Sequence, residues 1–415
     1  VNLNTSLSIL VEDLQGDHMD VYFKTNASGS WGIIGTNLSC DNGTYIQSTT
    51  NMNQYNTTYY WSVNVTDYGT NGWTNKTFMF TTVPDAGVYI ENIDYSFEGA
   101  SLKSLTQLGH NQISFEIDDS QVYTYRAWFY FNITQGALNQ TVEFQQTNGR
   151  ESLYHKCVYS YDGETWYRFA ESQPSWSHTF TSDSVLVAWT FPTYQYSFLE
   201  SYLDEKNSLG LPFYNRSVIG QSVEGRNIEC VTITNTSVPL CEKEVIWVLT
   251  GQHPNEKHSQ IQTWYMMDFL LNESNETAAY YRDQYLFKIF PMINPDGVYH
   301  GFNRYNANLQ DLNREWDDGP GNYEPEVDAV FGYFKDWLNA GKDIDVLIDQ
   351  HDLGGYSIWT IPSSYTNPRV YANVHDFGSY IVDETMYTGL GDNWYEGRST
   401  DVIPAEYNIT ALTPE

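Results

Sequence analysis

The sequence has few basic residues. It contains 20 Lys and Arg against 52 Asp and Glu, which gives a formal net charge of -32 at pH 7. Such a field repels phosphate backbones and anionic lipid surfaces and keeps a protein in solution. The charge therefore excludes nucleic acid as a partner.

Long apolar runs are also missing. No stretch of about 18 apolar residues is available to span a bilayer, so we expect no transmembrane segment. The sequence opens at Val1 without Met, a basic stretch or an apolar stretch. This start fits a mature chain after signal removal, or a cropped sequence.

Cysteine is scarce, and no pair has the CxxC spacing of a metal site. The four are Cys40, Cys157, Cys230 and Cys241. The last two flank VTITNTSVPL, a predicted hairpin that would bring their sulfurs within bridging distance, so we expect a Cys230–Cys241 disulfide. A Cys40–Cys157 bridge would join two domains, and buried thiols fit equally well.

Apolar and aromatic residues are plentiful. With 415 residues, 41% hydrophobic and 16% aromatic, the chain is large enough for two or three folded domains. N-glycosylation sequons are also frequent, although chance would supply roughly half as many in a chain so rich in Asn and Thr. They predict N-linked glycans and a secreted or cell-surface location. The acceptors are Asn4, Asn26, Asn37, Asn42, Asn56, Asn64, Asn75, Asn132, Asn139, Asn215, Asn235, Asn272, Asn275 and Asn408.

Residues 1–84 and 85–200 have the pattern of two all-β modules. Short alternating runs such as MDVYFKT and YYWSVNVTD are separated by Gly, Asn and Ser clusters, which is typical of a β-sandwich. Tyr60 and Trp61 are expected in its core, not on a ligand platform. Through YYWSVNVTD and the closing FTT, the first stretch resembles immunoglobulin-like or fibronectin type III-like modules.

Residues 201–415 change to an α/β pattern. EVIWVLTG, YLFKIFPMI and DIDVLIDQH are predicted strands, and SQIQTWYMMDFLL and EPEVDAVFGYFKDWLN are predicted helices. Strands alternating with helices predict a mainly parallel, helix-flanked mixed sheet. Ligands bind such sheets beyond the carboxyl ends of the strands.

Candidate metal ligands follow two of these predicted strands. GQHPNEKHS places His253 and Glu256 three positions apart after the first strand, and His351 ends DIDVLIDQH. Two imidazoles and a carboxylate suit a catalytic Zn²⁺ with an open fourth position. HxxE alone is a weak signal, a core histidine is the alternative for His351, and His258 is a rival ligand. Asp349 or Asp352 would orient a ligand imidazole.

The motifs HPNE, NPDG, DLNR and the strand-end histidine, in this order, resemble the zinc metallocarboxypeptidase family, nearest to its cytosolic-carboxypeptidase-like branch. In the second β stretch, WFYFNI, YSYDGETW and AWTFPTYQYSFLESYL look like the β-sandwich before the catalytic domain of that branch. The resemblance implies one zinc ion per chain and peptide or protein C-termini as substrates.

The resemblance also implies roles for single residues. Asn313 and Arg314 would bind the terminal carboxylate, Arg304 would stabilise the oxyanion, and Glu415 would be the general base. Family members continue beyond this base, so a trimmed sequence is expected. Arg398 would favour acidic C-terminal residues and Tyr395 would cover the substrate, while a solvated charge and a packing aromatic are their alternatives.

The sequence thus predicts a secreted or surface zinc metallocarboxypeptidase. One alternative is a glycosylated surface or filament-forming protein that reuses a peptidase fold and self-assembles through the edges of its β modules. A carbohydrate-binding adhesin is the other. All the motif residues of the site are present, which favours the enzyme.

Overall fold

The computed structural model describes most of the chain. The described residues are 5–54, 57–67, 72–82, 92–109, 111–118, 127–149, 151, 154–192, 194–319, 321–352, 357–385 and 387–414, without the side chain of residue 384. They divide into two compact units, 1–87 and 88–415. None of the helices described is long and apolar enough to cross a membrane.

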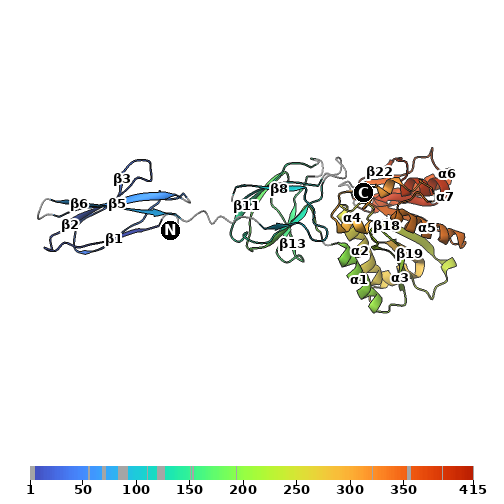
Figure 1. The fold of residues 1–415 in the computed structure, drawn as a ribbon. Helices are drawn as coiled ribbons and strands as arrows, with labels where there is room; N and C mark the ends of the chain where they lie inside the picture. The colour runs from blue at the N-terminus through green and yellow to red at the C-terminus, as the bar shows by residue number, and fades with distance from the viewer. Residues whose placement is uncertain are drawn as a thin grey trace. The chain divides into compact units, whose positions relative to one another are not determined.

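The first unit is built from β-strands (Figure 1). A four-stranded sheet has the order β3-β2-β5-β6, and β1 pairs with β4. The strands are β1 (Leu7–Val11), β2 (Met19–Thr25), β3 (Gly32–Cys40), β4 (Gly43–Gln47), β5 (Thr58–Asp67) and β6 (Trp73–Thr81). Successive side chains of a strand face opposite sides, so Trp61 is 8% exposed in the core while Tyr60 is 43% exposed. The expectation that both rings are buried was therefore wrong for Tyr60.

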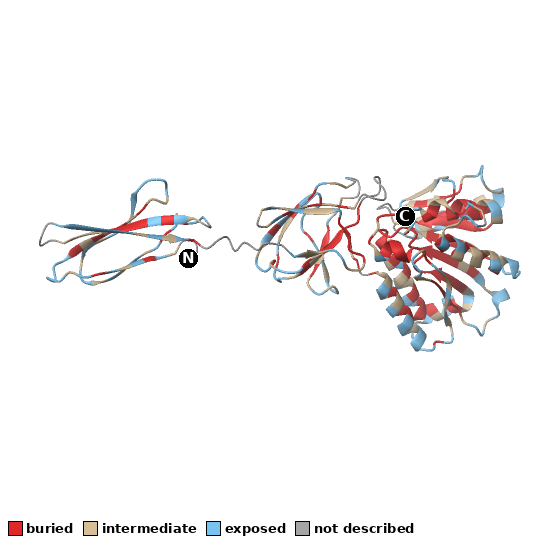
Figure 2. Cartoon of the chain, in the orientation of Figure 1, coloured by how far each residue is buried: buried red, intermediate tan, exposed pale blue. Residues whose placement is uncertain are grey.

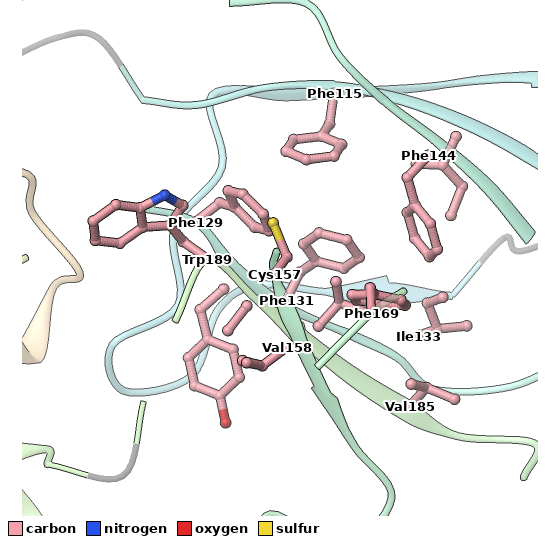
Figure 3. Close-up of a cluster of buried hydrophobic side chains, with 14 of the residues drawn as sticks. Phe115, Phe129, Phe131, Ile133, Phe144, Cys157, Val158, Phe169, Val185 and Trp189 are labelled. Carbon is pink, nitrogen blue, oxygen red and sulfur yellow. The ribbon is translucent and has the colours of Figure 1, made fainter. Parts of the chain in front are cut away.

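The second unit begins with two sheets that share one aromatic core. Their orders are β13-β12-β15-β10-β7 and β14-β11-β9-β8. Figure 3 shows part of this core, where Phe115, Phe129, Phe131 and Phe144 gather between the sheets. The strands are β7 (Ile93–Asp94), β8 (Ser104–Gly109), β9 (Gln112–Glu116), β10 (Tyr130–Ile133), β11 (Thr141–Gln146), β12 (Val158–Ser160), β13 (Trp166–Arg168), β14 (Ser175–Thr179) and β15 (Val185–Ala188).

The remainder of this unit is an α/β domain around an eight-stranded sheet of order β16-β17-β19-β18-β20-β23-β21-β22. The strands are β16 (Tyr214–Gln221), β17 (Asn227–Ile233), β18 (Glu244–Thr250), β19 (Tyr285–Phe290), β20 (Val346–Gln350), β21 (Ser357–Thr360), β22 (Gly389–Asp392) and β23 (Thr410–Pro414). The helices are α1 (Tyr196–Ser208), α2 (Lys257–Leu271), α3 (Glu276–Gln284), α4 (Pro295–Tyr299), α5 (Pro325–Asn339), α6 (Pro368–Glu384) and α7 (Ser399–Tyr407), with 3₁₀ turns η3 (Leu240–Glu242) and η4 (Leu312–Arg314).

Central strands β19, β18, β20 and β23 run parallel, and antiparallel pairings add β16, β17 and β21 outside them. The central strands β18, β19 and β23 are mostly buried, while the outer faces of the helices are exposed (Figure 2). Apolar side chains of α1 and α2 cover one face, and those of α5 and α7 cover the other. The predicted α/β domain with a mixed sheet and its β-rich N-terminal part are thus confirmed.

The predicted disulfide is absent. All four cysteines lie in the described part of the chain and are free thiols; Cys230 is buried and Cys241 is exposed. The expected hairpin does not form, because β17 pairs with β16 and β19, and Cys241 lies outside the sheet in η3. Cys40 and Cys157 likewise stay unbridged, in different units.

Thiol counting tests this assignment. We expect four reactive thiols in denaturant without reductant, and under native conditions Cys241 should react well before the buried Cys157 and Cys230. Labelling with a maleimide followed by peptide mass spectrometry checks both points. Two unreactive thiols in denaturant would contradict it.

The free energy of unfolding of the second unit should depend on pH through His155. Burial, aided by Arg168 and His258, lowers the pKa of His155 to about 4 from 6.5. Its neutral form therefore stabilises the fold fully above pH 6.5, and this contribution is lost as the pH falls toward 4. His155→Phe keeps an edge contact on Trp189 (4.6 Å between centroids in the wild type) but takes no proton.

We expect the wild type to lose about 1–2 kcal/mol more unfolding free energy than His155→Phe between pH 7 and pH 4.5, allowing for partial exposure. Denaturant unfolding at several pH values measures the difference. Parallel curves for the two proteins would show that His155 does not titrate in this way.

Candidate metal centre and active site

The ends of two neighbouring strands create the site. β18 and β20 are parallel, and Thr250 at the end of one lies beside Gln350 at the end of the other. His253 and Glu256 follow β18 within six residues, and His351 follows β20 directly. Parallel strands end at the same edge of a sheet, so these three side chains meet there.

His253, Glu256 and His351 form a group able to hold a metal ion, with one potential ligand atom from each within 4.8 Å of the others. The two Nδ1 atoms are 3.2 Å apart, and Glu256 carboxylate oxygens lie 2.8 Å from that of His253 and 2.7 Å from that of His351. Tetrahedral ligands about 2.05 Å from a zinc ion would be about 3.3 Å apart. The donor types and spacing therefore fit zinc.

The remaining ring nitrogens each face another carboxylate. His253 Nε2 is 3.0 Å from Asp311 Oδ1, and His351 Nε2 is 3.0 Å from Asp349 Oδ2. With a metal ion bound, a proton on each Nε2 would satisfy these contacts and leave both Nδ1 lone pairs available as ligands. The carboxylates thus select the tautomer that a metal requires.

The electrostatics of the site favour a cation among these side chains. Burial would raise the pKa of Glu256, but His253 and His351 lower it well below its usual range. Burial would also lower the pKa of His351, yet Asp349 and Glu256 raise it well above its usual value. The pocket therefore favours positive charge between its carboxylates.

Each outer carboxylate is held by further donors. Asp349 accepts from Gln252 Nε2 at 2.6 Å and Ser399 Oγ at 2.5 Å, while Asp311 Oδ2 accepts from Arg304 Nε at 2.6 Å. Burial would raise the pKa of Asp311, but His253, Arg304 and Arg314 lower it strongly. Both carboxylates thus remain ionised beside the metal ligands.

The residues expected to bind the substrate carboxylate lie next to the metal group. Asn313 is 3% exposed, and its Nδ2 is 3.0 Å from His351 Nε2. Arg314 Nη1 donates to the Asn313 carbonyl at 2.6 Å, and its guanidinium lies 4.9 Å from the centroid of the Tyr395 ring. Tyr395 is 48% exposed.

Arg398 has a different environment from the one expected for an acid-selecting residue. It is 7% exposed, and its Nε donates to Asp401 Oδ2 at 2.5 Å. Nη2 also donates to the Asn393 carbonyl at 2.6 Å. The Asp401 carboxylate pairs with its charge, and the two bonds together fix its position.

Glu415 and His258 are the remaining residues for which the sequence predicted a role at the site. Glu415 lies outside the described residues. His258 does not belong to the metal group: its Nδ1 bonds to Asp352 and its Nε2 is 3.2 Å from Thr190 Oγ1. Asp349, and not Asp352, is therefore the aspartate beside the His351 ring.

Sequence reasoning overlooked Asp311, Gln252 and Ser399. Asp311 is the first residue of DLNR, so its motif was visible, but only the Asn and Arg of that motif had been given a role. Its contact with His253 spans 58 residues. Gln252 and Ser399 carry no motif signal, and only the folded chain shows their contacts with Asp349.

Comparison with known families agrees with this site. Residues 199–390 match the family of zinc carboxypeptidases, and residues 93–191 match the cytosolic carboxypeptidase N-terminal domain. This family implies one zinc ion per chain, and the His253–Glu256–His351 group supplies suitable ligands.

Individual proteins show the same similarity. The chain is 28% identical to cytosolic carboxypeptidase 6 of Caenorhabditis elegans over 65% of its own length and 63% of the relative, and 30% identical to that of Mus musculus over 62% and 52%. It thus spans less than two thirds of these relatives.

Solved structures share the fold. A metallo-carboxypeptidase from Burkholderia cenocepacia superposes with a TM-score of 0.66 at 22% identity, covering 78% of this chain and 88% of that one. A metallo-carboxypeptidase from Pseudomonas aeruginosa, in complex with (2-guanidinoethylmercapto)succinic acid, gives a TM-score of 0.60 at 21% identity, covering 78% and 88%.

The predicted secreted or cell-surface location was wrong. Relatives from Caenorhabditis elegans, Homo sapiens and Mus musculus are named cytosolic carboxypeptidases, and residues 93–191 match the cytosolic carboxypeptidase N-terminal domain. Use of the sequons and self-assembly gain no support from them.

The contact between Asp349 and His351 yields a test. Asp349→Asn removes the charge that orients the ring, so we expect the zinc dissociation constant to rise about 10–100-fold. Asp352→Asn is the matched control, since it removes the same charge one residue from His351 but its side chain bonds to His258. Competition with a chromophoric chelator measures both; equal shifts would contradict a specific role for Asp349.

Proposed function

Because the chain contains a zinc carboxypeptidase domain preceded by a cytosolic carboxypeptidase N-terminal domain, we propose that it is a zinc-dependent metallocarboxypeptidase. Its substrates are the C-termini of peptides or proteins. The observation that carries the proposal is the buried His253–Glu256–His351 group, with both Nδ1 atoms directed at one carboxylate. A family match without these ligands would not support catalysis.

The proposal assigns the metal to these three residues. When bound, zinc acts as a Lewis acid and lowers the pKa of water toward about 7. Asp311 and Asp349 keep the two imidazoles in the required tautomer and orientation. This division of roles follows from the contacts of each ring.

Recognition of the substrate falls to the segment after the ligands. Asn313 and Arg314 bind the terminal carboxylate, because a guanidinium offers paired donors to its two oxygens. Arg304, which is 4% exposed and bonded to Asp311, stabilises the negative charge that develops on the scissile carbonyl oxygen. Tyr395 lies beside Arg314 and covers the bound residue, as its exposed ring allows.

Arg398 was expected to select acidic C-terminal residues. Since Asp401 already pairs with its guanidinium, we propose that it shapes the wall of the pocket and contributes little net charge to it. This leaves the preferred C-terminal residue to be measured.

Glu415 completes the proposed machinery as general base. It takes a proton from the attacking water and delivers it to the leaving amine. This role is supported by the position of Glu415 directly after β23, since β23 is the parallel neighbour of β20 and β20 leads to His351.

We also propose that the chain has three domains, 1–84, 85–200 and 201–415. The last two lie close to the ranges that match the two families.

Zinc content and activity can be measured together. We expect one zinc per chain and release of C-terminal amino acids from a peptide panel, lost with a chelator and restored by zinc. In Glu256→Ala, zinc affinity and the rate of amino-acid release should each fall by at least about 100-fold, since the variant lacks a metal ligand. Arg314→Ala should retain zinc and raise KM, because it removes substrate binding.

Amino-acid analysis of the released products and metal analysis of the protein provide the two readouts. A zinc-loaded wild type that releases no C-terminal residue would overturn the proposed activity. Unchanged zinc and turnover in Glu256→Ala would overturn the ligand assignment.

A further inference from the structure

Residues 93–191, which we term the sandwich module, contact the segments that carry the site. The Gly99 amide donates to the Tyr299 carbonyl at 2.7 Å. Gly301 approaches so closely that a Cβ there would lie 2.5 Å from the Gly99 carbonyl oxygen, and its φ is +65°. Lys257, next to Glu256, places its Nζ 5.0 Å from the centroid of the Trp128 ring.

One side chain makes three hydrogen bonds to the module. Asn303 is 2% exposed, and its Oδ1 accepts from the amides of Ala127 and Trp128 at 2.9 and 2.8 Å. Its Nδ2 donates to the Asp118 carbonyl at 3.1 Å. A single amide thus satisfies three backbone groups of the sandwich module, at a position where unpaired groups would be costly.

Asn303 is also the neighbour of Arg304, and Arg304 leads to the metal group. Arg304 Nε donates to Asp311 Oδ2, and Asp311 Oδ1 faces His253 Nε2. Fixing the backbone at Asn303 therefore restricts the guanidinium that follows it. The connection from the module to a metal ligand passes through hydrogen bonds and one peptide bond.

We propose that Asn303 is a positioning residue that makes the sandwich module a working part of the active site. By anchoring to the module, it holds Arg304 where the oxyanion of the substrate develops. The inference rests on the proposed function. It assigns to the module an effect on turnover that is separate from its effect on stability.

The test compares Asn303 variants of the full chain, each normalised to its zinc-loaded folded fraction. Asn303→Ala should retain one zinc and lower kcat about 10–100-fold with KM changed less than about threefold, because a shift of about 1 Å at Arg304 is costly in the transition state. Asn303→Asp keeps the oxygen that accepts from both amides but loses the donor to the Asp118 carbonyl, so its kcat should fall clearly less than that of Asn303→Ala.

The matched control is Asn148, which makes the same kind of clamp inside the module. Its Oδ1 accepts from the Ile117 amide at 2.6 Å and its Nδ2 donates to the Ile117 carbonyl at 2.9 Å. Asn148→Ala should lower the melting temperature and leave kcat unchanged. If Asn303→Ala lowers the melting temperature but retains kcat, as this control does, the positioning role is overturned.

Two further comparisons keep the result decisive. If Asn303→Ala does not fold, Asn303→Gln replaces it: the longer side chain displaces the amide, so its kcat should fall below that of Asn303→Asp, and equal values would overturn the proposal. Arg304→Ala separates the two hypotheses. An active wild type with an inactive Arg304→Ala and a fully active Asn303→Ala rejects only the positioning role, whereas an inactive wild type rejects the proposed function.

Discussion

The buried carboxylate of Glu256, held between two imidazoles, is the interaction on which the rest of the site depends. A carboxylate at 2% exposure is stable only when it is paired and hydrogen-bonded, and His253 and His351 provide both contacts. Each imidazole in turn needs a fixed orientation. Asp311 and Asp349 supply it by bonding to the two rings. The burial of one carboxylate therefore requires two histidines, and these in turn require two further carboxylates.

The need to bring His253, Glu256 and His351 together also explains the position of the site in the fold. Only the carboxyl edge of the parallel strands brings the segment after β18 next to the segment after β20. The antiparallel strands at the margins of the sheet enlarge the core without adding a metal ligand among the described residues. The parallel strands of the sheet thus position the metal ligands, while its antiparallel strands contribute to the core.

The sequence was informative where a local pattern and a strand end coincided. The strands before His253 and His351 are short apolar runs, and the residues after parallel strands meet by geometry, so three distant ligands could be grouped correctly. Contacts between segments far apart in the sequence could not be predicted. Nothing local indicates that β17 pairs with β19 instead of folding back, that Asp311 meets His253, or that Asn303 meets Ala127 across 176 residues.

Sequence composition was the weakest guide. The sequons suggested export, but an Asn- and Thr-rich chain produces many of them by chance, and the relatives reported above are named cytosolic carboxypeptidases. Motifs in a fixed order were more reliable than frequencies, because each one restricts both residue type and position.

The clamp at Asn303 has a consequence for synthesis of the chain on the ribosome. At roughly 5–20 residues per second, about 10–35 s separate the emergence of Ala127 from that of Asn303, 176 residues later. Throughout that interval the amides of Ala127 and Trp128 lack their final acceptor, and Trp128 lacks the cover that leaves it fully buried in the finished protein. The first half of the chain therefore exposes apolar surface and unpaired backbone amides until the second half has been synthesised.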